Sequence, residues 1–187
     1  MSLPPDARAC ADTIRLVILD VDGVMTDGTL WYGEHGEVLK PFHVRDGFGI
    51  KLLRRAGIDV AVISGRCCPP LRRRLDELPI DHVFLERDDK DTALSELLAR
   101  TGVPTSSVAH VGDDVLDLPV MRRVGLGITV QDAHPAVRRF ASWTTHAPGG
   151  RGAVREVADD LLEARGVLEE TCDALIAEKH GRAEPSP

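Results

Sequence analysis

The stretch Ile14-Arg15-Leu16-Val17-Ile18-Leu19-Asp20-Val21-Asp22-Gly23 joins an apolar run to two carboxylates and a glycine. Apolar residues occupy both faces of the run, as a β-strand covered by helices on both sides requires. Two carboxylates on alternate residues can divide the work of a reaction, one as nucleophile and metal ligand and the other as general acid and base. The stretch therefore predicts a central parallel strand with a reactive site at its carboxyl end.

Asp20 and Asp22 also have simpler interpretations, namely a turn stabilised by an Asp side chain or a calcium-binding loop. An EF-hand loop would need an acidic or amide residue at position 24 and a glutamate at position 31, where Val24 and Trp31 stand. A calcium loop of that type is therefore excluded, while the turn interpretation stays open.

Apolar runs and helical patterns alternate along the rest of the chain. We expect further strands at 58–63, 83–85, 108–111, 126–130 and 142–145, with helices at 47–55, 71–78, 93–100, 118–124, 135–140 and 153–165. Repeated alternation of this kind predicts an α/β fold with a doubly wound, mostly parallel, Rossmann-like sheet. Residues 29–32 and 38–43, separated by a glycine-containing turn, predict a β-hairpin that projects from the sheet edge as a flap.

The composition indicates a single acidic domain. The chain has 187 residues and a net charge of −7, which argues against non-specific binding to nucleic acid. It has no run near the ~20 apolar residues that span a bilayer and no signal peptide, so we expect a cytoplasmic protein without a membrane partner. We expect residues 1–166 to form the domain and 167–187 a polar, partly helical tail. The four cysteines form no C-x-x-C pair and are expected to be free thiols: Cys10, Cys67, Cys68 and Cys172.

A second acidic motif, Gly112-Asp113-Asp114 with Asp117, follows the expected strand at 108–111. The carboxylates of Asp20 and Asp113 and the backbone carbonyl of Asp22, together with waters and a phosphate oxygen, would give Mg²⁺ its six hard oxygen ligands. Asp114 and Asp117 could instead cap the next helix. For Asp117, capping or support of the metal ligands and direct ligation of the metal all stay open.

Ser64 follows the expected strand at 58–63, and Lys90 opens an expected helix. Ser64, with Gly65, offers a hydroxyl and backbone N–H groups that suit a phosphate oxygen, although a serine there could also be a helix N-cap. Lys90 opens a helix, where a cation meets the positive end of the helix dipole, so an anion is expected beside it. The alternative partners of Lys90 are its neighbours in the sequence: Asp88, Asp89 and Asp91.

In chain order these residues resemble the four motifs of the haloacid dehalogenase superfamily of phosphohydrolases: Asp20 with Asp22, Ser64, Lys90, and Asp113 with Asp117. The resemblance implies that Asp20 attacks phosphorus to form an aspartyl-phosphate. Asp22 would then protonate the leaving oxygen and later activate water. Lys90 and Ser64 would hold the phosphoryl group, and Mg²⁺ would neutralise the charge that assembles there.

Longer stretches resemble the 3-deoxy-D-manno-octulosonate (KDO) 8-phosphate phosphatase family over roughly residues 12–166, at 20–24, 43–47, 112–114, 132–135 and 149–156. This resemblance implies a Mg²⁺-dependent tetramer that releases phosphate from a sugar-acid phosphate of the lipopolysaccharide inner core. Carried over by position, the substrate contacts fall on Asp22, His43, Val44, Arg45, Asp46, Gly47, Lys51, Arg66, Arg74 and Lys90.

The spacing between the motifs leaves no room for a cap domain, either between Asp20 and Ser64 or between Ser64 and Lys90. Phosphoryl-transfer sites exclude water, so a neighbouring subunit is expected to cover this one. We therefore expect a homo-oligomer with shared sites, by resemblance a tetramer, in which the tail 167–187 reaches a neighbour's site.

Three other functions are weighed against this one. A phosphatase for a nine-carbon sialic-type acid 9-phosphate would have similar motifs and the same capless build. A receiver-type signalling domain also uses Asp, Ser or Thr, Lys and Mg²⁺, but its lysine lies on the last strand, after the acidic residues. Here Asp113 follows Lys90, which disfavours a receiver. A catalytically silent structural subunit is disfavoured because the four motifs are intact.

Overall fold

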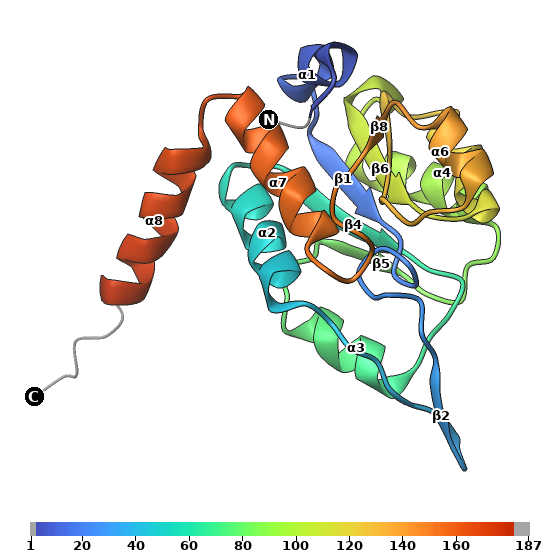
Figure 1. Ribbon diagram of the computed structural model, residues 1–187. Coiled ribbons are helices and arrows are strands. Elements are labelled where there is room, and N and C mark those ends of the chain that lie inside the picture. Colours follow the sequence, from blue (N-terminus) through green and yellow to red (C-terminus); the bar gives the residue numbers. More distant parts are fainter. Residues whose placement is uncertain (1–2, 182–187) are drawn as a thin grey trace, which may run out of the picture.

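A six-stranded parallel sheet forms the centre of the computed structural model, which describes residues 3–181 (Figure 1). The strand order is β5-β4-β1-β6-β7-β8, so β1 lies in the middle. Leu19 of β1 pairs in register with Val62 of β4 and Val111 of β6. The strands are β1 (Leu16–Leu19), β4 (Asp59–Ile63), β5 (His82–Phe84), β6 (Val108–Gly112), β7 (Leu126–Thr129) and β8 (Trp143–Thr144). The expected doubly wound parallel sheet is confirmed.

Helices cover both faces of the sheet, which explains why β1 is apolar on both sides. Val17 and Leu19 belong to one apolar cluster with α1 (Pro5–Ala11), α2 (Val44–Arg55), α3 (Pro69–Asp76) and α7 (Ala153–Ala164). Leu16 and Ile18 belong to a second cluster with α4 (Lys90–Thr101) and α5 (Leu118–Met121). Because successive side chains of a strand point to opposite faces, the single run from Leu16 to Leu19 serves both layers.

The hairpin of β2 (Trp31–Gly33) and β3 (Gly36–Leu39) is confirmed and projects away from the sheet (Figure 1). Its strands are shorter than expected, and residues 40–43 connect them to α2. Gly36 has φ +105, a conformation that a side chain would disfavour, and so allows the tight turn. Trp31, Tyr32 and Leu39 are 53%, 63% and 62% exposed, so the hairpin presents apolar side chains to solvent.

Several boundaries differ from expectation, and α3 and α4 begin at Pro69 and Lys90 instead of residues 71 and 93. Helix α2 begins at Val44 instead of residue 47, so the stretch assigned to substrate contacts forms its first turn. Helix α5 ends at Met121, and a 3-10 turn (Val115–Asp117) precedes it. Helix α1 had no clear sequence signal. The other short elements are a 3-10 turn at Thr105–Ser107 and α6 (Pro135–Phe140).

The carboxyl-terminal region forms α8 (Leu168–Gly181), which packs against α2 and α7 of the same chain. Leu168, Cys172 and Leu175 contact the main apolar cluster, and Glu178 pairs with Arg55 at 2.7 Å. The reach of the tail into a neighbouring subunit stays a prediction, and residues 182–187 lie outside the described part. The four cysteines are free thiols. Over residues 3–181, no helix is both long and apolar enough to cross a membrane.

Candidate active site

The carboxyl ends of β1, β4 and β6 bring the motif residues to one edge of the sheet. Asp20 follows β1, Ser64 follows β4 and Asp113 follows β6, and the Asp20 N–H donates to the Val111 carbonyl at 3.0 Å. These three side chains line a cavity of about 260 Å³. Its other lining residues are Asp22, Gly65, Arg66, Arg87, Asp88, Lys90, Asp114, Leu116 and Asp117. The structure thus assembles all four motifs in one cavity, which we call the Asp20 cavity.

Lys90 is the cation at the centre of this cavity. It is buried at the start of α4, with Nζ 2.8 Å from Asp20 Oδ1 and 2.7 Å from Asp117 Oδ1. Burial lowers the pKa of Lys90, but the charges of these two carboxylates outweigh burial and raise it overall. The alternative pairing with sequence neighbours is wrong, because Asp89 caps α4 and Asp91 pairs with Arg123. The unfavourable position of Lys90 at a helix start is therefore offset by two buried anions.

Asp117 is saturated with hydrogen-bond donors. Its Oδ1 lies 2.7 Å from Lys90 Nζ and 3.0 Å from His110 Nε2, while Oδ2 accepts the backbone N–H groups of Asp113 and Asp114. Burial opposes ionisation of Asp117, yet His110 and Lys90 lower its pKa overall. With Asp114 it also forms a capping box around the 3-10 turn. Asp117 thus caps this turn and holds Lys90, and its role toward the metal stays a prediction.

Asp20 and Asp113 are the carboxylates free to hold a cation. Together with Asp117 they place one oxygen each within 4.8 Å of one another. Asp113 Oδ1 is buried without a hydrogen-bond partner. Burial and repulsion from Asp20 and Asp117 raise the pKa of Asp113 to about 8, and burial also raises the pKa of Asp20. An unpartnered buried oxygen and excess negative charge fit a divalent cation with hard oxygen ligands.

Gly23 is required by this arrangement. A Cβ at position 23 would lie 2.0 Å from Asp113 Oδ2, and the residue has φ +94. Any side chain would therefore collide with Asp113 and strain the backbone. The glycine of the first motif allows the carboxylates of β1 and β6 to approach.

The carboxylate of Asp22 points to different partners. Its Oδ1 accepts a short hydrogen bond from Lys40 Nζ, and Oδ2 lies 3.7 Å from Arg66 Nε. Lys40 follows β3 at the base of the hairpin, and its Nζ also lies 2.7 Å from Glu37 Oε1. The sequence reasoning missed Lys40 and Glu37 because neither belongs to a motif, although a buried charge with two partners is a strong signal once burial is known.

Ser64 is buried and lines the cavity with Asp20 and Asp113, and its Oγ accepts the backbone N–H of Arg66 at 3.2 Å. The N-cap of α3 is Cys68, so the interpretation of Ser64 as a helix N-cap is wrong. Arg66 Nη2 donates to Tyr32 Oη at 2.8 Å and lies 3.3 Å from Glu37 Oε2. Arg87 also lines the cavity and was missed in the sequence, where it was one charge in a charged loop.

Residues 43–47 do not line the Asp20 cavity of their own chain. Asp46 is buried in the first turn of α2, where Oδ2 accepts the Gly152 N–H at 3.2 Å and Oδ1 accepts the Arg155 N–H at 2.9 Å. It therefore caps the start of α7. His43 is half-buried, whereas Val44 and Arg45 are exposed.

Gly47 and Arg74 meet between α2 and α3. A Cβ at Gly47 would lie 2.3 Å from Arg74 Nη2, so glycine makes room for the guanidinium group. Arg74 lies over the ring of Phe42, with Cζ 5.9 Å from its centroid. Arg74 does not line the Asp20 cavity either.

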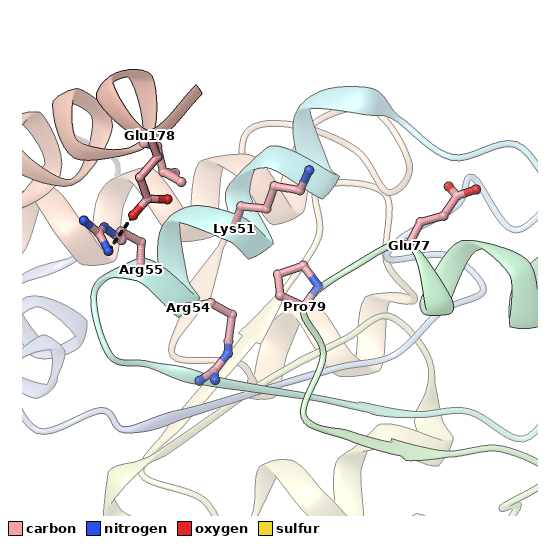
Figure 2. Close-up of a pocket in the computed structure, with 7 residues that line it drawn as sticks. Lys51, Arg54, Arg55, Glu77, Pro79 and Glu178 are labelled. Atoms are coloured by element: carbon pink, nitrogen blue, oxygen red, sulfur yellow. Dashed lines mark ion pairs between the residues drawn. The ribbon is translucent and has the colours of Figure 1, made fainter. Parts of the chain in front are cut away.

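Lys51 lies in a separate, larger cavity of about 550 Å³ (Figure 2). Lys51, Arg54 and Arg55 come from α2, and Glu178 of α8 forms the ion pair with Arg55 that is drawn dashed (Figure 2). The remaining lining residues are Glu77, Pro79 and Leu175. The two cavities share no lining residue, so the structure does not bring Lys51 to the Asp20 cavity within one chain.

Comparison with known proteins identifies relatives over most of the chain. A family model described as haloacid dehalogenase-like hydrolase matches residues 80–154. The 3-deoxy-D-manno-octulosonate 8-phosphate phosphatase KdsC of Salmonella typhimurium is 47% identical over 166 residues, which cover 89% of this chain and 88% of that protein. The crystal structure of the phosphatase of the same name from Yersinia pestis has a TM-score of 0.86 and 48% identity, covering 88% of this chain and 89% of its own.

A second solved structure carries ligands. The 3-deoxy-D-manno-octulosonate 8-phosphate phosphatase of Moraxella catarrhalis, in complex with a magnesium ion, a phosphate ion and a KDO molecule, has a TM-score of 0.84 and 38% identity. The match covers 91% of this chain and 96% of that one. Nearly the whole of each relative is therefore represented here. The chain belongs to the 3-deoxy-D-manno-octulosonate 8-phosphate phosphatase family of haloacid dehalogenase-like hydrolases.

Proposed function

We propose that this chain is a Mg²⁺-dependent phosphomonoesterase that hydrolyses KDO 8-phosphate to KDO and phosphate in lipopolysaccharide inner-core biosynthesis. The observation that carries the proposal is the cavity in which Lys90 bridges Asp20 and Asp117 while Asp113 keeps an unpartnered oxygen. This geometry suits a nucleophilic carboxylate, a fixed cation and a metal. We infer the substrate from the relatives, which are named as KDO 8-phosphate phosphatases.

The reaction follows from the residues in two displacements. In the first, an Asp20 oxygen attacks phosphorus, the bond from phosphorus to the sugar oxygen breaks, and Asp22 gives that oxygen a proton. In the second, Asp22 takes a proton from water, the water oxygen attacks the phosphoryl group on Asp20, and phosphate leaves. Lys90 and Ser64 hold the phosphoryl oxygens throughout.

Asp20 and Asp113 would hold Mg²⁺ through their carboxylates, and Asp22 through its backbone carbonyl. When bound, the ion supplies positive charge against the phosphoryl oxygens and the clustered carboxylates. The Asp22 carboxylate is directed toward Lys40 and Arg66, which leaves it free of the metal and available for proton transfer.

Steady-state kinetics on two sugar-acid phosphates tests the substrate. We expect kcat/KM to favour KDO 8-phosphate over a nine-carbon sialic-type acid 9-phosphate, and Asp20→Asn to abolish turnover of both. A preference for the nine-carbon compound would overturn the choice of substrate while leaving the reaction class intact.

A receiver-type domain is the rival from another class, and p-nitrophenyl phosphate separates the two. A phosphatase releases p-nitrophenolate over many turnovers in the presence of Mg²⁺. A receiver would instead take up one stable phosphoryl group per chain with a small acyl phosphate as donor, and that result would replace the enzyme assignment.

We further infer that the active form is a cytoplasmic homo-oligomer, by family a tetramer, with sites shared between subunits. Trp31, Tyr32 and Leu39 on the hairpin and Val44 at the start of α2 are large exposed apolar residues, and Val44 is 79% exposed. Apolar side chains clustered on one projecting element favour burial against another copy. The proposed contacts at His43, Arg45, Lys51 and Arg74 lie outside the Asp20 cavity of their own chain, which supports completion by a neighbour. Sedimentation showing a fully active monomer would contradict this inference.

A further inference from the structure

Asp22 and three other charged side chains form one group at the base of the hairpin. Lys40 has a fully buried side chain, and its Nζ contacts Asp22 Oδ1 and Glu37 Oε1. Arg66 contacts the same two carboxylates, at 3.7 Å from Asp22 and 3.3 Å from Glu37. Two cations and two carboxylates thus alternate in a closed group. Its formal charges balance, which reduces the cost of burying them.

Within this group, Lys40 makes the bond that fixes the Asp22 side chain. Asp22 Oδ2 is buried without a hydrogen-bond partner, and the approach of Arg66 Nε at 3.7 Å is too long for a hydrogen bond. The hydrogen bond from Lys40 Nζ to Oδ1 therefore orients the carboxylate. Asp22 is at the same time one of the residues that line the Asp20 cavity, together with Asp20 and Lys90.

Glu37 in turn fixes Lys40. Its side chain is almost fully buried and contacts both Lys40 and Arg66. Burial lowers the pKa of Lys40, but the bonds to Asp22 and Glu37 raise it overall, so Lys40 stays a cation at neutral pH. A lysine held by two carboxylates in the interior loses much of the rotational freedom of an exposed lysine.

We propose that Lys40 is a positioning residue that aims the Asp22 carboxyl group at the leaving-group oxygen, with Glu37 holding Lys40 in place. The inference rests on the proposed function, because it assumes that Asp22 protonates the leaving group. It makes the base of the hairpin part of the active site, although Lys40 itself does not line the Asp20 cavity.

Leaving groups of different basicity reveal such a role. The alkoxide of a sugar needs a proton as it leaves, whereas p-nitrophenolate, whose conjugate acid has a pKa of about 7, leaves without one. Misplacing Asp22 should therefore slow the first displacement selectively on the sugar phosphate, and kcat/KM reports that displacement without the later attack of water, which both substrates share. We expect Lys40→Met to lower kcat/KM on KDO 8-phosphate by about 30-fold and on p-nitrophenyl phosphate by less than about threefold. Lys40→Arg should recover part of the lost activity.

A matched control distinguishes positioning from a general loss of stability. Arg54 also bridges two carboxylates, Asp59 and Asp81, and it lies near the opposite end of β4. Arg54→Met should lower the melting temperature without changing the ratio of the two rates. Equal losses on both substrates in Lys40→Met would overturn the inference.

Two further variants distinguish a failure of the positioning role of Lys40 from a failure of the acid role of Asp22. Asp22→Asn should show the same selective loss as Lys40→Met, and more strongly. If Asp22→Asn is selective and Lys40→Met is not, the positioning role fails and the proposed function stands. If Asp22→Asn lowers kcat/KM equally on both substrates, the acid role itself fails. Should Lys40→Met not fold, Glu37→Gln decides the matter, since it must also slow the sugar phosphate selectively, and equal losses would again overturn the role.

Discussion

Lys90 and Lys40 are both buried lysines, and each bridges two carboxylates, yet they belong to different regions of the molecule. Lys90 starts α4 and contacts Asp20 and Asp117 at the edge of the central sheet. Lys40 lies at the base of the hairpin and contacts Asp22 and Glu37. The Lys90 site is built by strand β1 and helix α4, which are both part of the packed apolar core. The Lys40 site depends on a hairpin whose apolar side chains face solvent.

The proposed nucleophile and metal ligands therefore belong to the sheet, whereas the orientation of the proposed proton donor depends on the hairpin. The groups that would attack phosphorus and bind the metal are fixed within one chain, because they project from paired strands. The group that would protonate the leaving oxygen is held through the hairpin, whose apolar side chains are exposed. We therefore expect the sheet edge to be complete in a single chain and the hairpin to be completed by a neighbour.

Lys90→Met should have the largest effect and act on all substrates alike. It removes the cation from two buried carboxylates, and we expect kcat/KM to fall by about 10³-fold on both KDO 8-phosphate and p-nitrophenyl phosphate. Unfolding experiments should show a loss of about 3 kcal/mol, because the buried anions lose their partner. A loss of activity confined to the sugar phosphate would contradict the proposed difference between Lys90 and Lys40.

Asp22→Asn should come next and should spare the metal. We expect kcat on KDO 8-phosphate to fall by about 10²-fold, because general acid catalysis contributes an effect of that size. Mg²⁺ affinity, measured by calorimetry, should stay close to that of the parent, since the proposed contact is a backbone carbonyl. Asp113→Asn is the matched comparison and should weaken Mg²⁺ binding strongly. Weak Mg²⁺ binding by Asp22→Asn would show that its carboxylate is a ligand.

A charged substitution on the hairpin should lower activity by a smaller factor, because it disrupts the proposed oligomer. Leu39→Glu replaces an exposed apolar side chain, so the chain should fold normally while its sedimentation coefficient falls. We expect kcat/KM on KDO 8-phosphate to drop by about 10-fold as the shared sites are lost. Phe140→Glu, on exposed α6, is the control and should leave assembly and kinetics unchanged. An unchanged oligomer in Leu39→Glu would place the interface elsewhere.

The smallest expected effect is on the pH dependence of stability without metal. Burial and the charges of Asp20 and Asp117 raise the pKa of Asp113 to about 8, far above the ordinary value of an aspartate. The folded chain then binds a proton that the unfolded chain releases, so stability is greater below this range and falls as pH rises from 4 to 8. Melting in EDTA should show a decrease of several degrees over this range. Asp113→Asn should flatten the curve, and a rise with pH would contradict the assignment.

The sequence predicted the sheet and its reactive edge because both are local signals. Each motif directly follows an apolar run, so the order of strands and polar residues along the chain places Asp20, Ser64 and Asp113 at the carboxyl ends of parallel strands. Gly23 could likewise be expected, since the close approach of two acidic loops requires a residue without a side chain.

Other roles arise only from contacts between distant segments. Asp46 belongs to a stretch that resembles substrate contacts, yet its carboxylate caps α7, more than a hundred residues later in the chain. Lys51 lies in a cavity closed by α8, and Lys40 has no motif to mark it. A sequence pattern gives the face of a helix or strand, but not which remote backbone N–H or carboxylate will meet it.

The sequence by itself thus determined the α/β architecture, the four motifs and the absence of room for a cap domain, because strand periodicity and motif spacing are local properties of the chain. Tertiary structure decided how the charges are shared: Lys90 with Asp20 and Asp117, Lys40 with Asp22 and Glu37. The physical reason is burial, since a buried charge must find an opposite charge, and only the packed chain determines which one lies within reach.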